Sequence, residues 1–267
     1  MRSSILLILT FVTTTFGLSQ VKFTEHIISS NIKGAYSLFA IDINGDSDID
    51  ILSAPNGGGW TNPGKLELFN NDGAENFTSV EIDQNNNGFY AVYAADFDSD
   101  GNIDVVASKR GTLVWYKNNG SESFTLNSID SEKEFSDVYA IDLDNDGDND
   151  ILSCTSNTGS IDYPHVDKVL WYENDGTGSF TKHTIVSDAH RASAVFAIDL
   201  DSDGDIDVLH SSTWDNTVAW HKNDGNENFT TYVISSSAGF AKDVFALDMD
   251  GDNDIDIITV QFTDSKV

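Results

Sequence analysis

The sequence is poor in cysteine and in basic residues. Its 267 residues contain a single cysteine, Cys154, so no disulfide can form within the chain. Only 14 lysines and arginines stand against 44 aspartates and glutamates, which gives a formal net charge of −30. Nucleic-acid backbones and anionic lipids repel such a chain, so we expect no nucleic-acid partner. Strong acidity is also typical of disordered chains, but 16 phenylalanines, 8 tyrosines and 5 tryptophans indicate a folded core.

Long hydrophobic runs are absent after the first residues of the chain. The N-terminus has the parts of an export signal: the basic Met1-Arg2, the apolar segment 5–12, and small residues at Gly17 and Ser19. The apolar segment is too short to cross a bilayer, which takes about 20 residues. We therefore predict a signal peptide over residues 1–19. The mature chain is then secreted or held at the cell surface, and it has no transmembrane segment.

The sequence does contain a clear internal repeat. The nine-residue pattern Asp-x-Asp/Asn-x-Asp-x-x-x-Asp, followed by two aliphatic residues, recurs about every 50 residues. A second pattern runs in phase with the first: an aromatic pair, then Asn-Asp/Asn-Gly, then Phe-Thr. The five acidic loops begin at Asp42, Asp96, Asp142, Asp199 and Asp248, and the second pattern covers residues 68–78, 115–125, 171–181 and 220–230.

Short runs of β-branched and aromatic residues flank these motifs. Segments such as 138–141 precede the acidic loops and segments such as 151–153 follow them. The aromatic pair and the Phe-Thr segment mark two further strands, joined by a tight Asn-Asp-Gly turn. Four strands per repeat predict an all-β fold, a β-propeller of four-stranded antiparallel blades. We expect about four complete blades and partial blades at both ends of the chain.

The acidic loops have the composition of a site for a hard cation. Carboxylates at positions 1, 3 and 5 converge when a tight turn folds them inward, and the carboxylate at position 9 closes the far side. A backbone carbonyl and water complete the oxygen shell that Ca²⁺ prefers, whereas Mg²⁺ wants a stricter octahedron and Zn²⁺ wants His or Cys. One such loop is equally typical of a solvated turn, but five in register favour calcium sites built into the fold. The predicted side-chain ligands are Asp42, Asn44, Asp46, Asp50, Asp96, Asp98, Asp100, Asp104, Asp142, Asp144, Asp146, Asp150, Asp199, Asp201, Asp203, Asp207, Asp248, Asp250, Asp252 and Asp256.

Together the two motifs resemble the FG-GAP and VCBS repeats of the integrin α-subunit head and of many secreted bacterial proteins. The resemblance covers residues 21–267 and implies a β-propeller with calcium between the first and second strands of each blade. Asn44 at position 3, and Ser47 and Asn253 in place of a position-6 glycine, depart from the pattern, so we expect weaker binding in the first and fifth loops. The resemblance also implies that position 7 supplies a backbone oxygen, from Asp48, Asn102, Asp148, Asp205 and Asp254.

The length of the chain does not match a complete ring. The resemblance implies a propeller of about seven blades, which at about 50 residues each is longer than this sequence. Residues 23–28 match an isolated fourth strand, and Val267 falls inside an expected strand. We therefore expect a C-terminally truncated fragment, with repeats over residues 20–267.

The sequence contains no catalytic signature, and we predict no catalytic residue. It lacks HExxH, GxSxG and phosphate-loop motifs, and most of its paired carboxylates belong to the acidic loops.

Alternate connections of a blade lie on opposite faces, so the variable segments 54–64, 155–167 and 212–216 share the face away from the acidic loops. Variable loops on a repeated scaffold are a usual place for recognition. The candidate ligand contacts there are Trp60, Tyr163, His165 and Trp214, although such aromatic residues also cover blade edges without binding a ligand.

These observations favour a secreted, non-enzymatic calcium-binding module for binding or adhesion. Its partner is expected to be an extracellular protein or carbohydrate. The alternative is an extracellular polysaccharide lyase or hydrolase, or the propeller appendage of one.

Overall fold

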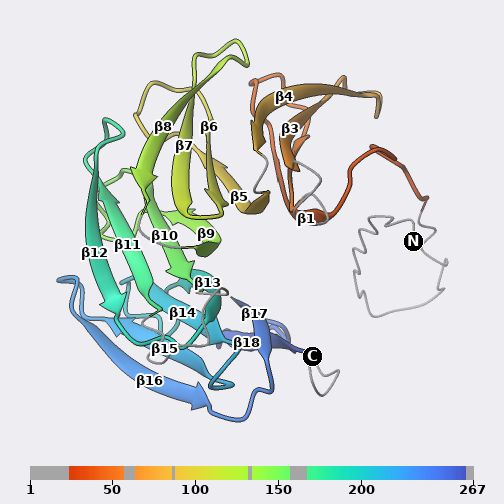
Figure 1. Ribbon diagram of the computed structural model, residues 1–267. Helices are drawn as coiled ribbons and strands as arrows, with labels where there is room; N and C mark the ends of the chain where they lie inside the picture. Colours follow the sequence, from red (N-terminus) through yellow and green to blue (C-terminus); the bar gives the residue numbers. More distant parts are fainter. Residues whose placement is uncertain (1–23, 57–63, 86–87, 132–133, 157–166, 263–267) are drawn as a thin grey trace.

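The computed structural model describes residues 24–56, 64–85, 88–131, 134–156 and 167–262, and these residues form strands and turns only. They fold into four four-stranded antiparallel sheets and one two-stranded sheet (Figure 1). We number these sheets as blades 1 to 5. The strands, in chain order, are β1 (Ala35–Ile41), β2 (Asp50–Pro55), β3 (Gly64–Asn71), β4 (Phe77–Asn85), β5 (Phe89–Ala95), β6 (Asp104–Lys109), β7 (Thr112–Asn118), β8 (Phe124–Asp130), β9 (Phe135–Ile141), β10 (Asp150–Thr155), β11 (Val169–Asn174), β12 (Phe180–Val186), β13 (Ala192–Ile198), β14 (Asp207–Ser212), β15 (Val218–Asn223), β16 (Phe229–Ser235), β17 (Ala241–Leu247) and β18 (Asp256–Gln261).

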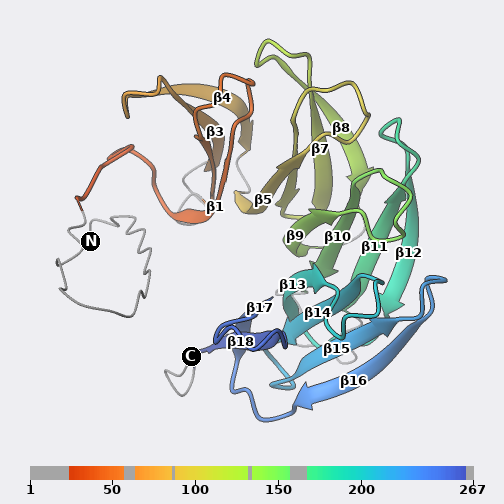
Figure 2. The ribbon, with the colours of Figure 1, turned by 180° about the vertical axis from the view of Figure 1, so that it is seen from behind.

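Each blade is a simple meander, and the blades fan out around a common centre. Strand order within a sheet follows the sequence, as in β1-β2-β3-β4. The first strand of each blade lies nearest the centre and the fourth lies outermost (Figures 1 and 2). One aromatic side chain from each inner strand continues a stack across all five blades. Neighbouring ring centroids in this stack lie 4.1–5.2 Å apart, and its members are Phe39, Tyr93, Tyr139, Phe196 and Phe245.

The hydrophobic core is divided into four clusters, and each cluster lies between two adjacent blades. The cluster between blades 1 and 2 includes Leu52 and Val105, and the cluster between blades 2 and 3 includes Val106 and Ile151. Two more clusters join blade 3 to blade 4 and blade 4 to blade 5. Fully burying one such aliphatic side chain contributes about 1.5–3 kcal/mol, so the contacts between blades dominate the stability of the fold.

Polar contacts add to two of these junctions. Tyr116 of blade 2 donates a hydrogen bond to Asp83 of blade 1 at 2.6 Å, and Tyr172 of blade 3 donates one to Asp130 of blade 2 at 2.7 Å. A lysine pairs with the same carboxylate in each case, Lys109 with Asp83 at 3.1 Å and Lys182 with Asp130 at 2.6 Å. The equivalent tyrosine thus fixes one blade against the outer strand of the preceding blade.

Blade 4 replaces this tyrosine with a histidine. His221 occupies the position of Tyr172, and its Nε2 lies 2.7 Å from Nδ1 of His210. The two rings are stacked at an interplanar angle of 13°, and Nδ1 of His221 lies 2.9 Å from the hydroxyl of Thr231. Burial lowers the pKa of His210 to about 4 and the pKa of His221 to about 3. Both histidines are therefore neutral near pH 7.

The predicted all-β propeller is confirmed, and one predicted strand is wrong. Residues 24–28, which the sequence predicts to be the end of an isolated fourth strand, form no strand in the structure. A strand needs a hydrogen-bonded neighbour, and no strand of the described chain pairs with this segment. The predicted signal peptide and Val267 lie outside the described residues. Within the described part, no helix is long and apolar enough to cross a membrane.

Candidate metal centres

Each acidic loop connects the first strand of a blade to the second and contains two left-handed residues. Position 6 has a φ between 74° and 100° in all five loops, and position 4 has a φ between 55° and 79°. Glycine occupies at least one of the two positions in every loop. Where position 6 is Ser47 or Asn253, position 4 is Gly45 or Gly251. The missing position-6 glycines of the first and fifth loops are thus matched by a glycine two residues earlier.

The first carboxylate of each loop organises the turn. In the third loop, the backbone N–H groups of Asp146 and Gly147 each donate a hydrogen bond of 3.0 Å to one oxygen of Asp142. In the first loop, Asp42 accepts equivalent bonds from Asp46 at 3.1 Å and Ser47 at 2.9 Å. These bonds bend the chain so that the side chains at positions 3 and 5 turn toward the same point.

The carboxylate at position 9 begins the second strand and is buried in the first four loops. In blade 3, one oxygen of Asp150 accepts the N–H of Leu143 at 3.0 Å and the other accepts the N–H of Asn174 at 2.8 Å. The same pair of bonds recurs in blades 1, 2 and 4. Burial raises the pKa of Asp150 to about 7 and that of Asp104 to about 6. A nearby divalent cation would offset this cost of burying a charge.

Position 7 connects the acidic loop to the Asn-Asp-Gly turn of its own blade. The glycine of that turn has a φ of 75° in blade 1 and 73° in blade 4. A Cβ atom on Gly73 would lie 2.5 Å from an oxygen of Asp48, and one on Gly225 would lie 2.7 Å from an oxygen of Asp205. The turn therefore requires glycine for both its conformation and its contact with the loop. These contacts confirm that the two motifs share one face of the propeller.

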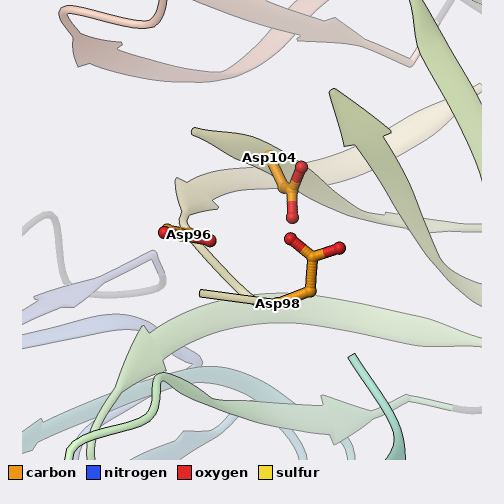
Figure 3. Close-up of side chains that lie close together, drawn as sticks. All are labelled: Asp96, Asp98 and Asp104. Atoms are coloured by element: carbon orange, nitrogen blue, oxygen red, sulfur yellow. The ribbon is translucent and has the colours of Figure 1, made fainter. Parts of the chain in front are cut away.

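Acidic oxygens converge in four of the five loops. Groups of three carboxylates have oxygen atoms that all lie within 4.8 Å of one another in the second to fifth loops. Figure 3 shows Asp96, Asp98 and Asp104 of the second loop directed toward a common point. Within the described residues, the first loop, which has Asn44 at position 3, forms no such group of three carboxylates. The members of the four groups are Asp96, Asp98 and Asp104; Asp142, Asp144 and Asp146; Asp199, Asp201 and Asp203; and Asp248, Asp250 and Asp256.

The donor set of the second loop fits a hard cation. One carboxylate oxygen of Asp96 and one of Asp98 are buried, and within the described chain neither has a hydrogen-bond partner. A buried anionic oxygen without a partner is costly, and a divalent cation at the point of convergence would satisfy both atoms. All the groups offer oxygen atoms only, which suits Ca²⁺ rather than Zn²⁺.

The sequence motif did not identify the residues of the third strand that face these loops. Lys117 forms ion pairs with Asp98 and, at 3.2 Å, with Asp100. Lys222 pairs with Asp201 and, at 2.9 Å, with Asp203. Two loops thus have an ammonium group among their carboxylates. The third loop has Glu173 at this position instead, and Glu173 is one of the negative charges that raise the pKa of Asp144, after the larger effect of burial.

Among the predicted ligand contacts, only Trp214 lies within the described residues; Trp60, Tyr163 and His165 do not. Trp214 is part of the loop between β14 and β15, on the face opposite the acidic loops. Its ring lies 5.1 Å from the guanidinium carbon of Arg191, which the sequence did not single out.

The acidic loops that define these centres match a known family. A family model described as an FG-GAP-like repeat matches residues 42–107, 96–153, 142–210 and 201–259. The chain belongs to the FG-GAP-like repeat family. Each matched FG-GAP-like repeat starts at or beside an acidic loop and continues into the first two strands of the next blade.

A solved structure resembles this FG-GAP-like propeller over most of its length. It is the structure of an Agrocybe aegerita lectin that specifically recognises non-reducing terminal N-acetylglucosamine. The match has a TM-score of 0.59 at 18% sequence identity and covers 92% of this chain and 67% of the lectin chain. At this identity the likeness establishes the shared fold. No curated protein sequence matches the chain.

Proposed function

We propose that this protein is a secreted β-propeller, stabilised by Ca²⁺, that binds an extracellular glycan without altering it chemically. The convergence of carboxylate oxygens in successive acidic loops supports the calcium part of the proposal. Calcium binds the folded loop and has little affinity for the unfolded one, so it stabilises the fold by linkage. The calcium-loaded loops are structural, and they hold the blades rigid for recognition elsewhere on the surface.

The choice of a glycan over a protein as ligand rests on the fold. The Agrocybe aegerita lectin has a similar fold and recognises a sugar, so a propeller of this shape is compatible with carbohydrate binding. FG-GAP-like repeats serve as binding modules, which supports a function without catalysis. The carboxylate clusters of the described residues all lie in the acidic loops, where the calcium role already accounts for them.

The calcium part is tested by the thermal stability of the purified chain. We expect EDTA to lower the melting temperature by many degrees, and added CaCl₂ to restore it while MgCl₂ restores less. An unchanged melting temperature in EDTA contradicts the proposal.

A glycan array probed with and without EDTA tests the binding part, with calcium-dependent binding to carbohydrate as the expected result. Matrix proteins on the same array test the protein-ligand alternative, and loss of polymer viscosity tests the enzyme alternative.

Secretion is tested separately by expressing the whole chain with its native N-terminus in a secreting host. The mass of the exported product is expected to correspond to a chain that begins at Gln20. Retention of the full-length product inside the cell contradicts this part of the proposal.

A further inference from the structure

The face opposite the acidic loops contains a residue that is held in a strained conformation. Arg191 directly precedes the inner strand of blade 4 and has a φ of 64°, a left-handed value that is unfavourable for a residue with a Cβ. The equivalent positions of blades 1 and 2 contain Gly34 and Gly88, with φ values of 70° and 75°. Blade 4 therefore keeps an arginine where the fold prefers glycine. Strain retained in this way indicates a role for the side chain.

The surrounding structure fixes the backbone of Arg191 from both sides. Its N–H donates a hydrogen bond of 2.9 Å to the carboxylate of Asp167 in blade 3. Its carbonyl accepts bonds from the backbone N–H of Thr213 at 3.1 Å and from the Thr213 hydroxyl at 3.2 Å. The backbone position from which the Arg191 side chain extends is thus fixed by two loops from two different blades.

The guanidinium of Arg191 is held in place but, among the residues that the structure describes, it has no hydrogen-bond or ion-pair partner. It lies over the ring of Trp214, at 5.1 Å from the ring centroid, and its Nε is buried without a hydrogen bond. In the part of the chain that the structure describes, the Arg191 side chain forms no ion pair. Six of the nine other lysines and arginines in the described chain pair with Asp or Glu, among them Arg110 on the same face, which pairs with Glu134 at 3.0 Å. In a protein with 44 acidic residues, an arginine held apart from them is suited to an external anion.

A second strained residue extends this surface. Phe240 occupies the equivalent position in blade 5, with a φ of 50° and 42% of its surface exposed. Its N–H donates a hydrogen bond of 2.9 Å to the side chain of Asn216, which is in the same loop as Trp214. The loop 213–217 thus supports both Arg191 and Phe240. We call these residues and this loop the Arg191–Phe240 surface; it combines a cation, an aromatic ring and a polar loop.

The negative charge of the protein lies mostly elsewhere. The acidic loops are on the opposite face, one strand length of about 20 Å away, which is more than two Debye lengths at physiological salt. The nearby carboxylates are already engaged: Asp167 with the N–H of Arg191, Asp188 with His190 at 3.2 Å, and Asp215 with the N–H of Thr217 at 3.2 Å. Within the described residues, none of these carboxylates forms an ion pair with the guanidinium of Arg191.

We infer that the Arg191–Phe240 surface is a subsite for a carboxylate-bearing sugar of an acidic glycan. The guanidinium donates paired hydrogen bonds to the sugar carboxylate, and the exposed ring of Phe240 contacts apolar C–H groups of the chain. This inference rests on the proposed glycan-binding function and specifies its ligand class. An uncharged sugar would leave the guanidinium without an anion, so recognition depends on the carboxylate.

The test compares two oligosaccharides that differ only in whether their sugars have a carboxylate group. Binding of oligogalacturonate and of its carboxyl-reduced form to the calcium-loaded protein is measured by calorimetry at physiological salt. The variant is Arg191→Gly, which replaces a strained residue with the one used in blades 1 and 2 and is therefore expected to fold. The matched control is Arg110→Gln, which removes the same charge from the same face.

We expect the protein to prefer the oligogalacturonate, and Arg191→Gly to weaken that binding at least about tenfold, the cost of losing charge-assisted hydrogen bonds. Arg110→Gln is expected to bind like the original protein. Equal binding of the two oligosaccharides overturns the ligand class, and an acidic preference that survives Arg191→Gly overturns the site; either result leaves glycan binding intact. If neither of these oligosaccharides binds, the inference fails, while glycan binding as such is decided by the array.

Discussion

Two of the differences between the third strands of blades 3 and 4 are at consecutive residues, and they act on opposite sides of the sheet. Blade 3 has Tyr172-Glu173 where blade 4 has His221-Lys222. Because side chains alternate along a strand, the first residue faces the neighbouring blade and the second faces the acidic loop. One motif therefore gives two electrostatic environments. In blade 4 an ammonium group pairs with the loop, and in blade 3 a further carboxylate adds to its repulsion.

Calcium removal should produce the largest loss of stability, and it should affect the acidic loops of blades 3 and 4 to different extents. Calcium at 100 times its Kd stabilises a site by about 2.7 kcal/mol, so loss of several sites should lower the melting temperature by at least about 10 °C. Without calcium, Lys222 still pairs with Asp201 and Asp203 of the fourth loop, whereas the neighbouring charges that raise the pKa of Asp144 in the third loop are carboxylates. Hydrogen exchange in EDTA should therefore rise more over residues 142–150 than over 199–207. An equal rise in hydrogen exchange in the two loops would contradict the proposed difference between them.

Acid should weaken blade 4 through its buried histidines. Burial lowers the pKa of His210 to about 4 and that of His221 to about 3, while unfolded histidine has a pKa of about 6.5. The unfolded chain thus binds more protons below pH 6.5, and stability is lost as the pH falls from there toward the folded pKa values. The expected loss between pH 7 and pH 5 is about 2 kcal/mol for each histidine.

The control for this effect copies blade 1, which has Ser53 and Phe69 at the two positions. Urea unfolding of His210→Ser/His221→Phe in saturating calcium should be less dependent on pH over this range than that of the original protein. The same pH dependence in both proteins would show that other groups are responsible.

Exchanging the charges beside the loops should exchange their calcium affinities. Glu173→Lys places an ammonium group near Asp144 and should weaken the third site, while Lys222→Glu removes a competing cation and should tighten the fourth. One unit charge near a site at water-like dielectric corresponds to a roughly threefold change in Kd, and a reversal of charge to about tenfold. Calcium titrations followed by NMR of Gly147 and Gly204, one glycine in each loop, separate the two sites. Unchanged affinities would mean that the third strand has no influence on the loops.

The smallest expected effect is a difference in sign between the stability changes that two loop variants cause in the absence of calcium. In EDTA, Asp144→Asn should stabilise the protein by about 0.5 kcal/mol because it relieves repulsion among neighbouring carboxylates. Asp201→Asn should destabilise it under the same conditions because it breaks the contact with Lys222. In saturating calcium both variants lose a ligand and both should be less stable. Denaturant unfolding measures all four values, and the same sign for both variants in EDTA would contradict the proposed difference.

The sequence predicted the blades and the acidic loops because their determinants are local. The spacing of Asp42, Asn44 and Asp46, and the turn glycines such as Gly73, lie within short motifs whose chemistry requires those residue types. The left-handed position 4 could also have been found, since Gly45 and Gly251 occur where the position-6 glycine is missing.

The remaining site residues could not be predicted because they depend on register between distant segments. Lys117 lies 19 residues after Asp98 and Lys222 lies 21 residues after Asp201, and the pairing of the second and third strands brings each lysine to its carboxylate. Arg191 has no motif at all, and its strained backbone follows from bonds to Asp167 and Thr213 in two other loops. Residues 24–28 show the opposite error, since a segment with the composition of a strand but without a neighbouring strand forms no strand.

The division of the core between blades has a consequence for how such proteins change in length. Since each hydrophobic cluster is shared by two neighbouring blades, a blade removed from the chain would leave two half-layers exposed. If the chain is rejoined at the equivalent point of the next repeat, those two half-layers come together as a new interface of the same kind. Recombination between repeats can therefore lengthen or shorten the propeller in whole units, and crossovers at other spacings expose apolar surface and are expected to be eliminated.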